Sequence, residues 1–384
     1  MPDRPFDLLV RAGRLVGSVD GPRSPGAVAV RGDRIAAAGP AVAGSARTTL
    51  AFADGVLLPG LIDLHAHPAR EGSVFGVDPD REILPHGVTT VLSQGDAGAG
   101  NWPRYRRGTV EGSRTRVRLA LNLSAWGEAS PGGCFADPEA IDEEACARAI
   151  EEDAGRFIWG IAVNVSHHAC GTTDPREVLH RAGAVAGRTG RPLLYGMRRP
   201  QDWPLAEQLA GLRPGDVVTY CFRREPLGIV TGGRVHPAVR AARARGVLFD
   251  VGHGTASFDF PAAEVALADG FPPDTISTDL QARHLGQEPP HTLPRVMAKL
   301  RAAGMPEADV FAAATVCPAQ VLGLEGEVGT LAPGACADLT VLAWREDAAP
   351  LADAHGARRP GGCWEPLLTV RAGEIVGMRV GRGS

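Results

Sequence analysis

The fold is decided by the stretch Leu58-Pro59-Gly60-Leu61-Ile62-Asp63-Leu64-His65-Ala66-His67, an apolar strand that ends in two histidines. The histidines are spaced i, i+2, and side chains at this spacing lie on the same face of an extended strand. Both imidazoles can therefore bind one metal ion. Two histidines can also share a solvated face by chance, but the preceding Pro-Gly-x-Ile-Asp context favours a metal site.

Outward from this stretch, the middle of the chain alternates short apolar runs with longer segments of helical period. The apolar runs cover residues 88–92, 158–163, 192–195, 216–220 and 247–251, and the helical segments cover 139–153, 175–189, 237–245 and 293–303. This alternation predicts a parallel sheet with crossover helices. So many units within about 260 residues favour a closed (β/α)8 barrel. Barrel enzymes keep their active sites at the carboxyl ends of the strands, where His65 and His67 fall.

Both ends of the chain instead read as short strands separated by glycine, proline and aspartate turns. The expected strands are residues 6–11, 26–31 and 34–39 at one end, and 337–343 and 369–376 at the other. Two β-rich ends that bracket a barrel can pair into one small sheet domain. The sequence therefore predicts an α/β protein with a second part made of strands alone.

Composition and charge exclude several classes of protein. The chain has 384 residues, of which 44% are hydrophobic and 22% charged, as in ordinary globular proteins. Its net charge of −4 offers no basic field for nucleic acid and no polybasic patch for a membrane surface. No apolar run is long enough to span a membrane, the N-terminus lacks a signal-peptide pattern, and the seven cysteines are scattered. We therefore expect a cytoplasmic protein with reduced thiols, and neither nucleic acid nor a membrane as its partner.

The histidine stretch resembles the first-strand metal motif of the amidohydrolase superfamily. The similarity continues through residues 87–91, 160–163, 213–219, 249–254, 273–280 and 329–338, so it spans nearly the whole chain. The nearest branch resembles the dihydroorotase-like and D-aminoacylase-like group of amidohydrolases and deacetylases. This resemblance implies a TIM-like (β/α)8 barrel over residues 59–324 and a small β-sandwich domain formed by residues 1–58 and 325–384. It also implies that a metal-bound water hydrolyses a small-molecule substrate, and that the protein is a homo-oligomer.

The family pattern has six metal ligands, and the resemblance carries three of them to this chain. His65 and His67 match the first-strand pair. Asp279 matches the aspartate that closes the eighth strand, which binds metal and takes the proton of the attacking water. The bridging lysine of the fourth strand and the histidines of the fifth and sixth strands are replaced, at Ala162, Gly196 and Tyr220.

A centre with two metal ions is nearly excluded by these replacements. The only lysine, Lys299, lies in a helical stretch beyond Asp279, so no carboxylated lysine can bridge two ions. Two histidines and one carboxylate remain, which suffices for one divalent ion, with Zn²⁺ the expected metal. A bound zinc ion lowers the pKa of its water towards about 7, and Asp279 would act as general base and later protonate the leaving group. His167, His168 or His253 could supply a replacement ligand.

Other residues near the expected strand ends are candidates for catalysis or substrate binding. Tyr220 could donate a hydrogen bond to a developing oxyanion, or it could simply fill the space left by a metal ion. His253, flanked by Gly252 and Gly254, could contact substrate or act as acid or base. The expected substrate-binding residues are Arg198, for a substrate carboxylate, and Asn164 and His168 at the end of the fourth strand.

These residues favour a mononuclear metal-dependent hydrolase of an amide, cyclic amide or ester bond. One alternative is a metal-free cyclase, lyase or isomerase on the same scaffold that uses Tyr220, His253 and Asp279. Another is a non-catalytic family member retained for assembly or ligand binding. The intact trio of His65, His67 and Asp279 favours the hydrolase, because a decayed enzyme would have little reason to keep all three.

Overall fold

Seven parallel strands from the middle of the chain form one sheet in the computed structural model, which describes residues 5–17, 25–129 and 132–379. The sheet follows the order of the sequence in reverse, β13-β10-β9-β8-β7-β6-β5. Its strands are β5 (Leu61–Ala66), β6 (Val88–Gly98), β7 (Arg116–Asn122), β8 (Ile158–Asn164), β9 (Leu193–Gly196), β10 (Val217–Thr219) and β13 (Leu248–Phe249). All residues of β5 and β6 are buried, as expected for strands covered on both faces.

An irregular eighth segment closes this sheet between its two edge strands. Parallel bridges join Thr275 to Asp250 and Leu280 to Ala66, so residues 275–280 lie between the end of β13 and β5. The backbone hydrogen bond from Asp279 N to His65 O, 2.6 Å long, ties the segment to β5. The predicted (β/α)8 barrel is therefore confirmed, with the last strand reduced to isolated bridges.

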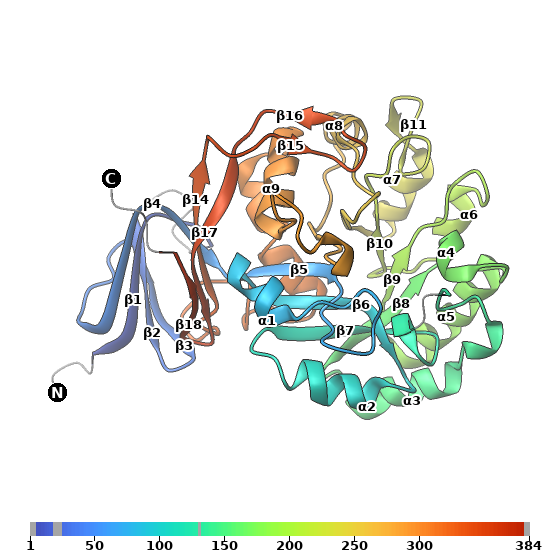
Figure 1. Ribbon diagram of the computed structural model, residues 1–384, viewed down its shortest axis with the longest axis horizontal. Coiled ribbons are helices and arrows are strands. Elements are labelled where there is room, and N and C mark those ends of the chain that lie inside the picture. The colour runs from blue at the N-terminus through green and yellow to red at the C-terminus, as the bar shows by residue number, and fades with distance from the viewer. Residues whose placement is uncertain (1–4, 18–24, 130–131, 380–384) are drawn as a thin grey trace.

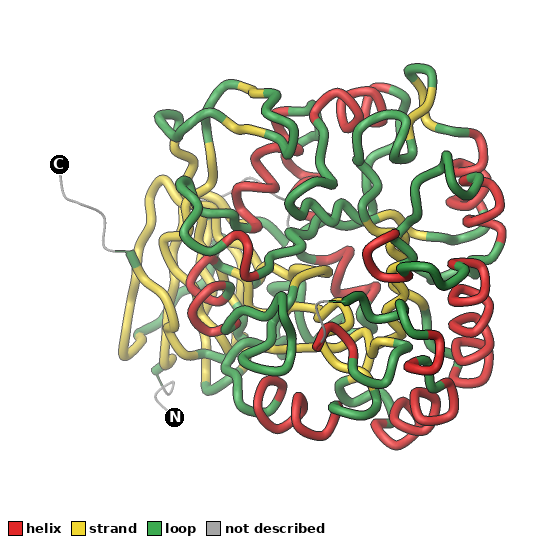
Figure 2. Tube along the Cα trace, turned by 45° about the vertical axis from the view of Figure 1, so that its right-hand side comes forward, coloured by secondary structure: helices red, strands yellow, loops and turns green. Residues whose placement is uncertain are grey.

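Helices cover the outside of the barrel (Figures 1 and 2). The longer ones are α3 (Glu143–Asp153), α5 (Pro175–Thr189), α7 (Pro237–Ala244), α8 (Phe260–Ala268) and α9 (Leu293–Ala302), and the shorter α6 (Leu205–Ala210) follows β9. Aspartate side chains cap several of them, and Asp174 begins α5 by accepting a hydrogen bond from Arg176 N. The helix expected over residues 139–153 begins later, because Asp142 caps α3 after a separate 3₁₀ turn.

Short elements occupy the connections. They are α1 (Pro79–Glu82), η1 (Leu84–His86), α2 (Trp102–Tyr105), η2 (Arg106–Val110), η3 (Gly127–Ala129), η4 (Pro138–Ala140), α4 (His167–Cys170), η5 (Ala282–His284), α10 (Glu307–Ala312), α11 (Val316–Val321) and the pair β11 (Val230–Thr231) and β12 (Arg234–Val235). Among the residues described, no helix has both the length and the apolar character needed to cross a bilayer.

Strands from the two ends of the chain join in a second sheet of seven strands within the described residues, in the order β18-β17-β14-β4-β1-β2-β3. They are β1 (Phe6–Leu15), β2 (Gly26–Arg31), β3 (Arg34–Gly39), β4 (Ala46–Pro59), β14 (Leu339–Arg345), β17 (Cys363–Arg371) and β18 (Glu374–Met378). The antiparallel pair β4–β14 joins the two ends, which lie together at one side of the barrel (Figure 1). Leu57, Val341 and Val370 belong to the buried core of this sheet.

The C-terminal strands depart from the expected ranges in two ways. The run expected over residues 369–376 is divided by a turn at Ala372 and Gly373, both with positive φ, so that it contributes to two strands. The hairpin of β15 (Leu351–Ala352) and β16 (Arg358–Arg359) leaves the terminal sheet and packs on the barrel, where Arg359 pairs with Glu264 of α8. Because this hairpin lies after residue 325 but contacts the barrel, the domain boundaries expected at residues 58 and 325 stay a prediction.

Candidate metal centre

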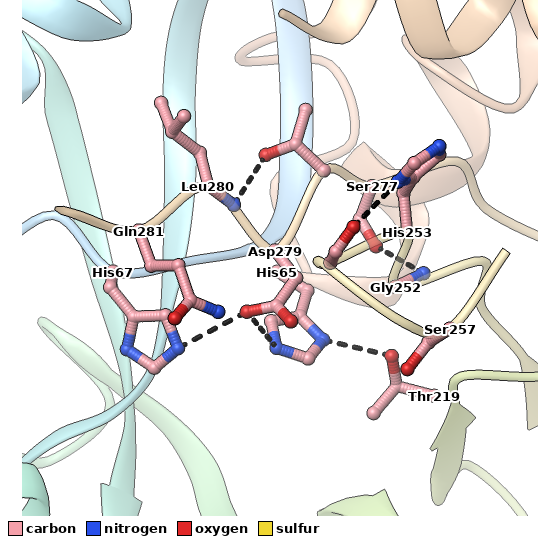
Figure 3. A network of polar contacts seen from close by, with 12 residues as sticks. His65, His67, Thr219, Gly252, His253, Ser257, Ser277, Asp279, Leu280 and Gln281 are labelled. Carbon is pink, nitrogen blue, oxygen red and sulfur yellow. Dashed lines mark hydrogen bonds and ion pairs between the residues drawn. The ribbon is translucent and has the colours of Figure 1, made fainter. Parts of the chain in front are cut away.

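Three predicted ligands meet at the carboxyl end of β5. His65 and His67 point to the same side of the strand, and Asp279 approaches them from the eighth segment (Figure 3). The Asp279 Oδ1 atom lies 3.4 Å from His65 Nε2 and 3.2 Å from His67 Nε2. All three side chains are buried, and one ligand atom from each lies within 4.8 Å of the others. Within the described residues, this is the one group of three or more histidines, cysteines and acids that could hold a metal ion.

The hydrogen bonds behind the histidines leave both Nε2 lone pairs free. Thr219 Oγ1 donates its proton to Asp250 Oδ2 at 2.9 Å, so at 2.8 Å from His65 Nδ1 it accepts that nitrogen's proton. Asp96 Oδ1 accepts in the same way from His67 Nδ1 at 2.9 Å. Ligating histidines are ordinarily fixed like this, with the second ring nitrogen bound to an oxygen behind it. Both imidazoles are therefore oriented as neutral ligands for a cation.

Two buried atoms at the centre of the trio form no hydrogen bond in the described part of the chain. They are His65 Nε2 and Asp279 Oδ1, the atoms that face each other across 3.4 Å. A buried nitrogen lone pair that faces a carboxylate oxygen is unfavourable, since neither can donate a hydrogen bond. A divalent cation would satisfy both atoms together with His67 Nε2. The residues present therefore fit a metal ion of the kind that prefers imidazole and carboxylate ligands.

The pKa values of Asp279 and His67 are shifted towards their charged forms by the opposite charges around them. Burial alone would raise the pKa of Asp279, but the neighbouring His65 and His67 hold it below its usual range. Burial likewise opposes a charge on His67, yet Asp96 and Asp279 raise its pKa well above the usual value. Without a cation, the acids thus draw a proton onto His67. A metal ion would have to displace that proton, which links its affinity to pH.

Backbone strain concentrates at this site. Asp279 and Tyr220 have φ values of 49° and 69°, in the left-handed region that non-glycine residues seldom adopt. Gly252 and Gly254 also have φ values of 50°. A Cβ at Gly254 would lie 2.4 Å from Asp279 Oδ2, so only glycine allows the loop after β13 to approach the carboxylate this closely.

Tyr220 fills the side of the barrel where the family pattern places further ligands. Its ring centroid lies 5.1 Å from that of His65, and the side chain is buried. A Cβ at Gly196 would lie 3.1 Å from the Tyr220 ring and 3.0 Å from the Asn164 carboxamide. Position 196 is therefore closed to a larger side chain while Tyr220 and Asn164 stand where they do. Burial raises the pKa of the Tyr220 phenol well above its usual value, so the hydroxyl keeps its proton.

Three residues predicted to bind substrate lie around the ends of β8 and β9. Asn164 accepts a hydrogen bond from Ser166 N at 3.1 Å, and Arg198 Nη1 donates to Val165 O at 3.2 Å. His168 is exposed, and its ring centroid lies 6.4 Å from that of Phe75. None of these three belongs to the ligand trio, and their contact with a substrate stays a prediction.

Two of the three histidines considered as replacement ligands, His167 and His253, are engaged elsewhere. His167 Nε2 pairs with Asp202 at 2.8 Å on the surface. His253 lies apart from the trio (Figure 3), with Nδ1 at 2.8 Å from Gly254 O and Nε2 at 2.7 Å from Lys299 Nζ. Both of its ring nitrogens are thus occupied by protein groups, and its predicted catalytic role gains no support from these contacts.

Sequence reasoning missed the residues that stand behind the ligands. Asp96 accepts a hydrogen bond from Ser93 Oγ at 2.6 Å as well as from His67, and Asp250 accepts from Thr219 and Thr275. Asp96 follows a buried apolar run, and an acid at the end of a barrel strand is a signal that could have identified it. Thr219 and Asp250 lie within the segments that resemble the amidohydrolase superfamily, but no role at the site was predicted for them.

A buried glutamate near the trio was also missed. Glu128 in η3 is 5% exposed and has no cationic side chain bonded to it in the described part of the chain. Burial raises its pKa to about 7, the nearby His67 opposes this rise by a smaller amount, and the charges of Asp96 and Asp279 add to it. Nothing in the spacing of the sequence marked this loop residue.

The amino-acid sequence is similar to one family model and to several known proteins. The sequence model of the amidohydrolase family matches residues 240–362. A deacetylase of Enterococcus faecalis is 30% identical over 376 residues, which cover 96% of this chain and 99% of that protein. A deacetylase of Agrobacterium fabrum is 31% identical over 358 residues, which cover 91% of this chain and 86% of that protein.

Solved structures show the same similarity in three dimensions. A crystal structure of an adenine deaminase gives a TM-score of 0.87 at 30% identity, over 96% of this chain and 99% of the other. A crystal structure of a dihydroorotase gives a TM-score of 0.85 at 30% identity, over 97% of this chain and 99% of the other. Each similarity extends over the barrel and the terminal sheet together.

Proposed function

The chain belongs to the amidohydrolase family and is a hydrolase of the kind that acts on carbon–nitrogen bonds, and on that premise we propose that it works with a single divalent ion. His65 Nε2, His67 Nε2 and a carboxylate oxygen of Asp279 would hold the ion, for which Zn²⁺ suits the ligand set. When bound, such an ion acts as a Lewis acid and lowers the pKa of a water molecule towards about 7. The observation that carries the proposal is that His65 Nε2 and Asp279 Oδ1 are buried, face each other at 3.4 Å and form no hydrogen bond within the described residues.

The occupied space around the trio supports one ion rather than two. The positions of the other family ligands hold Ala162, Gly196 and Tyr220, of which the first two have no ligand atom. The Tyr220 ring closes the space over Gly196. Lys299 is the only lysine, and it is bonded to His253.

The chain's own residues would move and stabilise charge during hydrolysis. Asp279 Oδ1 faces both imidazoles, which leaves Oδ2 to take the proton of the attacking water and return it to the leaving group. The Tyr220 hydroxyl, protonated at neutral pH, would donate a hydrogen bond to the oxyanion that develops on the substrate. Asn164, Arg198 and His168 lie around the neighbouring strand ends and would contact the rest of the substrate.

The substrate class follows from what the similar proteins share. They include deacetylases, an adenine deaminase and a dihydroorotase. We propose an amide, a cyclic amide or an ester bond in a small molecule as the target, because water attack at a carbon centre is common to these bonds.

Metal content and hydrolysis should be measured together in four proteins. The wild type is expected to hold about one divalent ion per chain and to hydrolyse a member of an N-acetyl, O-acetyl and cyclic amide panel. His65→Ala and Asp279→Asn should lose both the ion and the activity. His180→Ala, which changes an exposed histidine on α5, should keep both.

Three outcomes would count against this proposal. Two ions per chain would refute the single-ion centre. Hydrolysis that survives complete metal removal would favour the metal-free alternative. A wild-type protein that holds no ion after loading, and that hydrolyses no member of the panel, would favour a non-catalytic role.

A further inference from the structure

A cavity of about 580 Å³ lies beside the metal centre, and none of the three ligand residues lines it. It is bounded by α9, by the loop that follows β13 and by the β15–β16 hairpin. Figure 1 shows α9 and this hairpin close together. The residues that matter on its walls are His253, His284, His291, Arg295, Lys299 and Asp353. Small-molecule sites generally have volumes of about 300–1,000 Å³, so the cavity has room for more than a bare ion.

Two buried basic side chains face this cavity from consecutive turns of α9. Arg295 is 9% exposed and Lys299 is 5% exposed, and residues spaced i, i+4 lie on one face of a helix. Neither forms an ion pair with any described residue. Arg295 Nη2 donates to Pro350 O at 2.9 Å and to Ala349 O at 3.4 Å, and Lys299 Nζ forms a hydrogen bond with Nε2 of the neutral His253 ring at 2.7 Å.

Asp353, an acid on the cavity wall, raises the pKa of Lys299 through its charge but forms no ion pair with either base among the described residues. Asp353 accepts three backbone hydrogen bonds, from Phe260 N at 2.9 Å, His355 N at 2.8 Å and Ala357 N at 2.9 Å, and so holds the hairpin in place. Glu288, the other acid on the cavity wall, is exposed to solvent.

The histidines of the cavity offer donors rather than negative charge. His284 Nδ1 accepts from Gln281 N at 3.1 Å, so its proton sits on Nε2. That buried N–H interacts only weakly with the Gly254 carbonyl, which His253 already occupies, and forms no hydrogen bond of ordinary geometry. His291 donates from Nε2 to Thr278 O at 2.9 Å and is held neutral by burial.

Buried cations without a counter-charge are costly, and proteins ordinarily pair them. We propose that this cavity binds a small molecule through an oxyanion group, a carboxylate or a phosphate, held by Arg295 and Lys299. The planar Arg295 guanidinium suits two oxygens of such a group, and Lys299 adds a point charge. Burial and Arg295 lower the pKa of Lys299 to about 7, and a bound anion would restore its charge. This site does not depend on the proposed hydrolysis, since it shares no side chain with the ligand trio.

The single lysine makes a direct test possible. Protein labelled with [¹⁵N]lysine has one labelled backbone amide, that of Lys299, which reports on the cavity in two-dimensional NMR. Titration with succinate and with inorganic phosphate, each compared with sodium chloride at equal ionic strength, distinguishes an organic acid from a phosphate. We expect a saturable shift of this resonance with at least one anion, in protein with or without metal.

Two variants and a control decide what the shift means. Arg295→Gln should weaken the anion at least about tenfold, and Arg295→Lys, which keeps the charge but loses the fork, should weaken it less. Arg301→Gln, at an exposed position on the same helix, should bind as the wild type does. A shift no larger than that caused by chloride, or one that Arg295→Gln leaves unchanged while the variant remains folded, would overturn the proposal.

Discussion

Replacement of Asp96 by asparagine tests whether the hydrogen bond behind His67 tunes a metal ligand. Asp96 Oδ1 accepts from His67 Nδ1 at 2.9 Å and from Ser73 Oγ at 2.6 Å, and Oδ2 accepts from Ser93 Oγ at 2.6 Å. An asparagine keeps the shape and one accepting oxygen, and the Ser93 hydroxyl can rotate to accept from the new amide. The substitution therefore removes mainly the negative charge that makes His67 basic.

The expected loss of metal affinity follows from this geometry. Changes behind a ligating histidine cost about 10- to 100-fold in affinity, which corresponds to about 1.4–2.7 kcal/mol. Asp96→Asn, which preserves orientation, should fall near the lower value. Asp96→Ala, which also frees the ring to rotate, should fall near the upper one.

The pH dependence gives the prediction its sign. In the metal-free protein Asp96 and Asp279 raise the pKa of His67, so protons compete with the ion and affinity falls as pH falls. In Asp96→Asn the pKa of His67 is lower, because one of the two acids is gone, so protons compete with the metal ion only at lower pH. The ratio of wild-type to variant affinity should therefore be largest at high pH and should narrow as the pH falls.

Competition titration with a chromophoric chelator between pH 6 and about 8.5 measures this ratio, around the ordinary histidine pKa. The matched control is Asp202→Asn, which alters an exposed His–Asp pair of similar length, 2.8 Å, outside the site. A ratio that stays constant with pH, or an equal loss in the control, would refute the reasoning.

Three further predictions test neighbouring features. Gly254→Ala should weaken metal binding because its Cβ would lie 2.4 Å from Asp279 Oδ2, and it should destabilise the fold by about 1–2 kcal/mol because the residue has a left-handed φ. Gly183→Ala, on the open face of α5, is the control and should not destabilise the fold. Chemical denaturation and metal titration compare the two variants. Tyr220→Phe should lower kcat by about 10²- to 10³-fold with metal content unchanged if the phenol stabilises an oxyanion, and an unaltered kcat would mean that Tyr220 only fills space. Lys299 has a pKa of about 7 in the folded protein, below its unfolded value, so above pH 7 the unfolded chain binds more protons and stability rises with pH. Lys299→Met should therefore flatten the rise of Tm between about pH 7 and 9. An unchanged slope would show that the rise does not come from Lys299.

Much of the fold was predictable because it rests on local periodicity. The spacing of His65 and His67 predicted that they share one face, and the structure places both Nε2 atoms beside Asp279 Oδ1. Helix α5 begins and ends at the predicted residues, since Asp174 and Gly190 mark its two ends in the sequence. These features depend on neighbours along the chain.

The residues behind the ligands could not be predicted in the same way. Thr219 reaches His65 only because the barrel closes through the eighth segment, and Asp96 reaches His67 past an irregularity in the pairing of β6 with β7. Lys299 was expected in a helix, which is confirmed, but its contact with His253 depends on how α9 packs against the loop after β13. Such contacts follow from register and packing, which a single sequence does not state.

The altered ligand positions are best understood as one linked change rather than separate losses. Gly196 is compatible with the Tyr220 ring because it lacks a side chain, and a histidine there would collide with both Tyr220 and the Asn164 carboxamide. Tyr220 in turn adopts a left-handed φ of 69° beside Gly252, whose missing side chain would otherwise strike the Tyr220 backbone and Thr219. Restoring one ligand alone would therefore disrupt packing before it could bind a second ion. The same packing holds Thr219 against His65, so the residues that replace the second set of ligands support a histidine that would bind the single proposed ion.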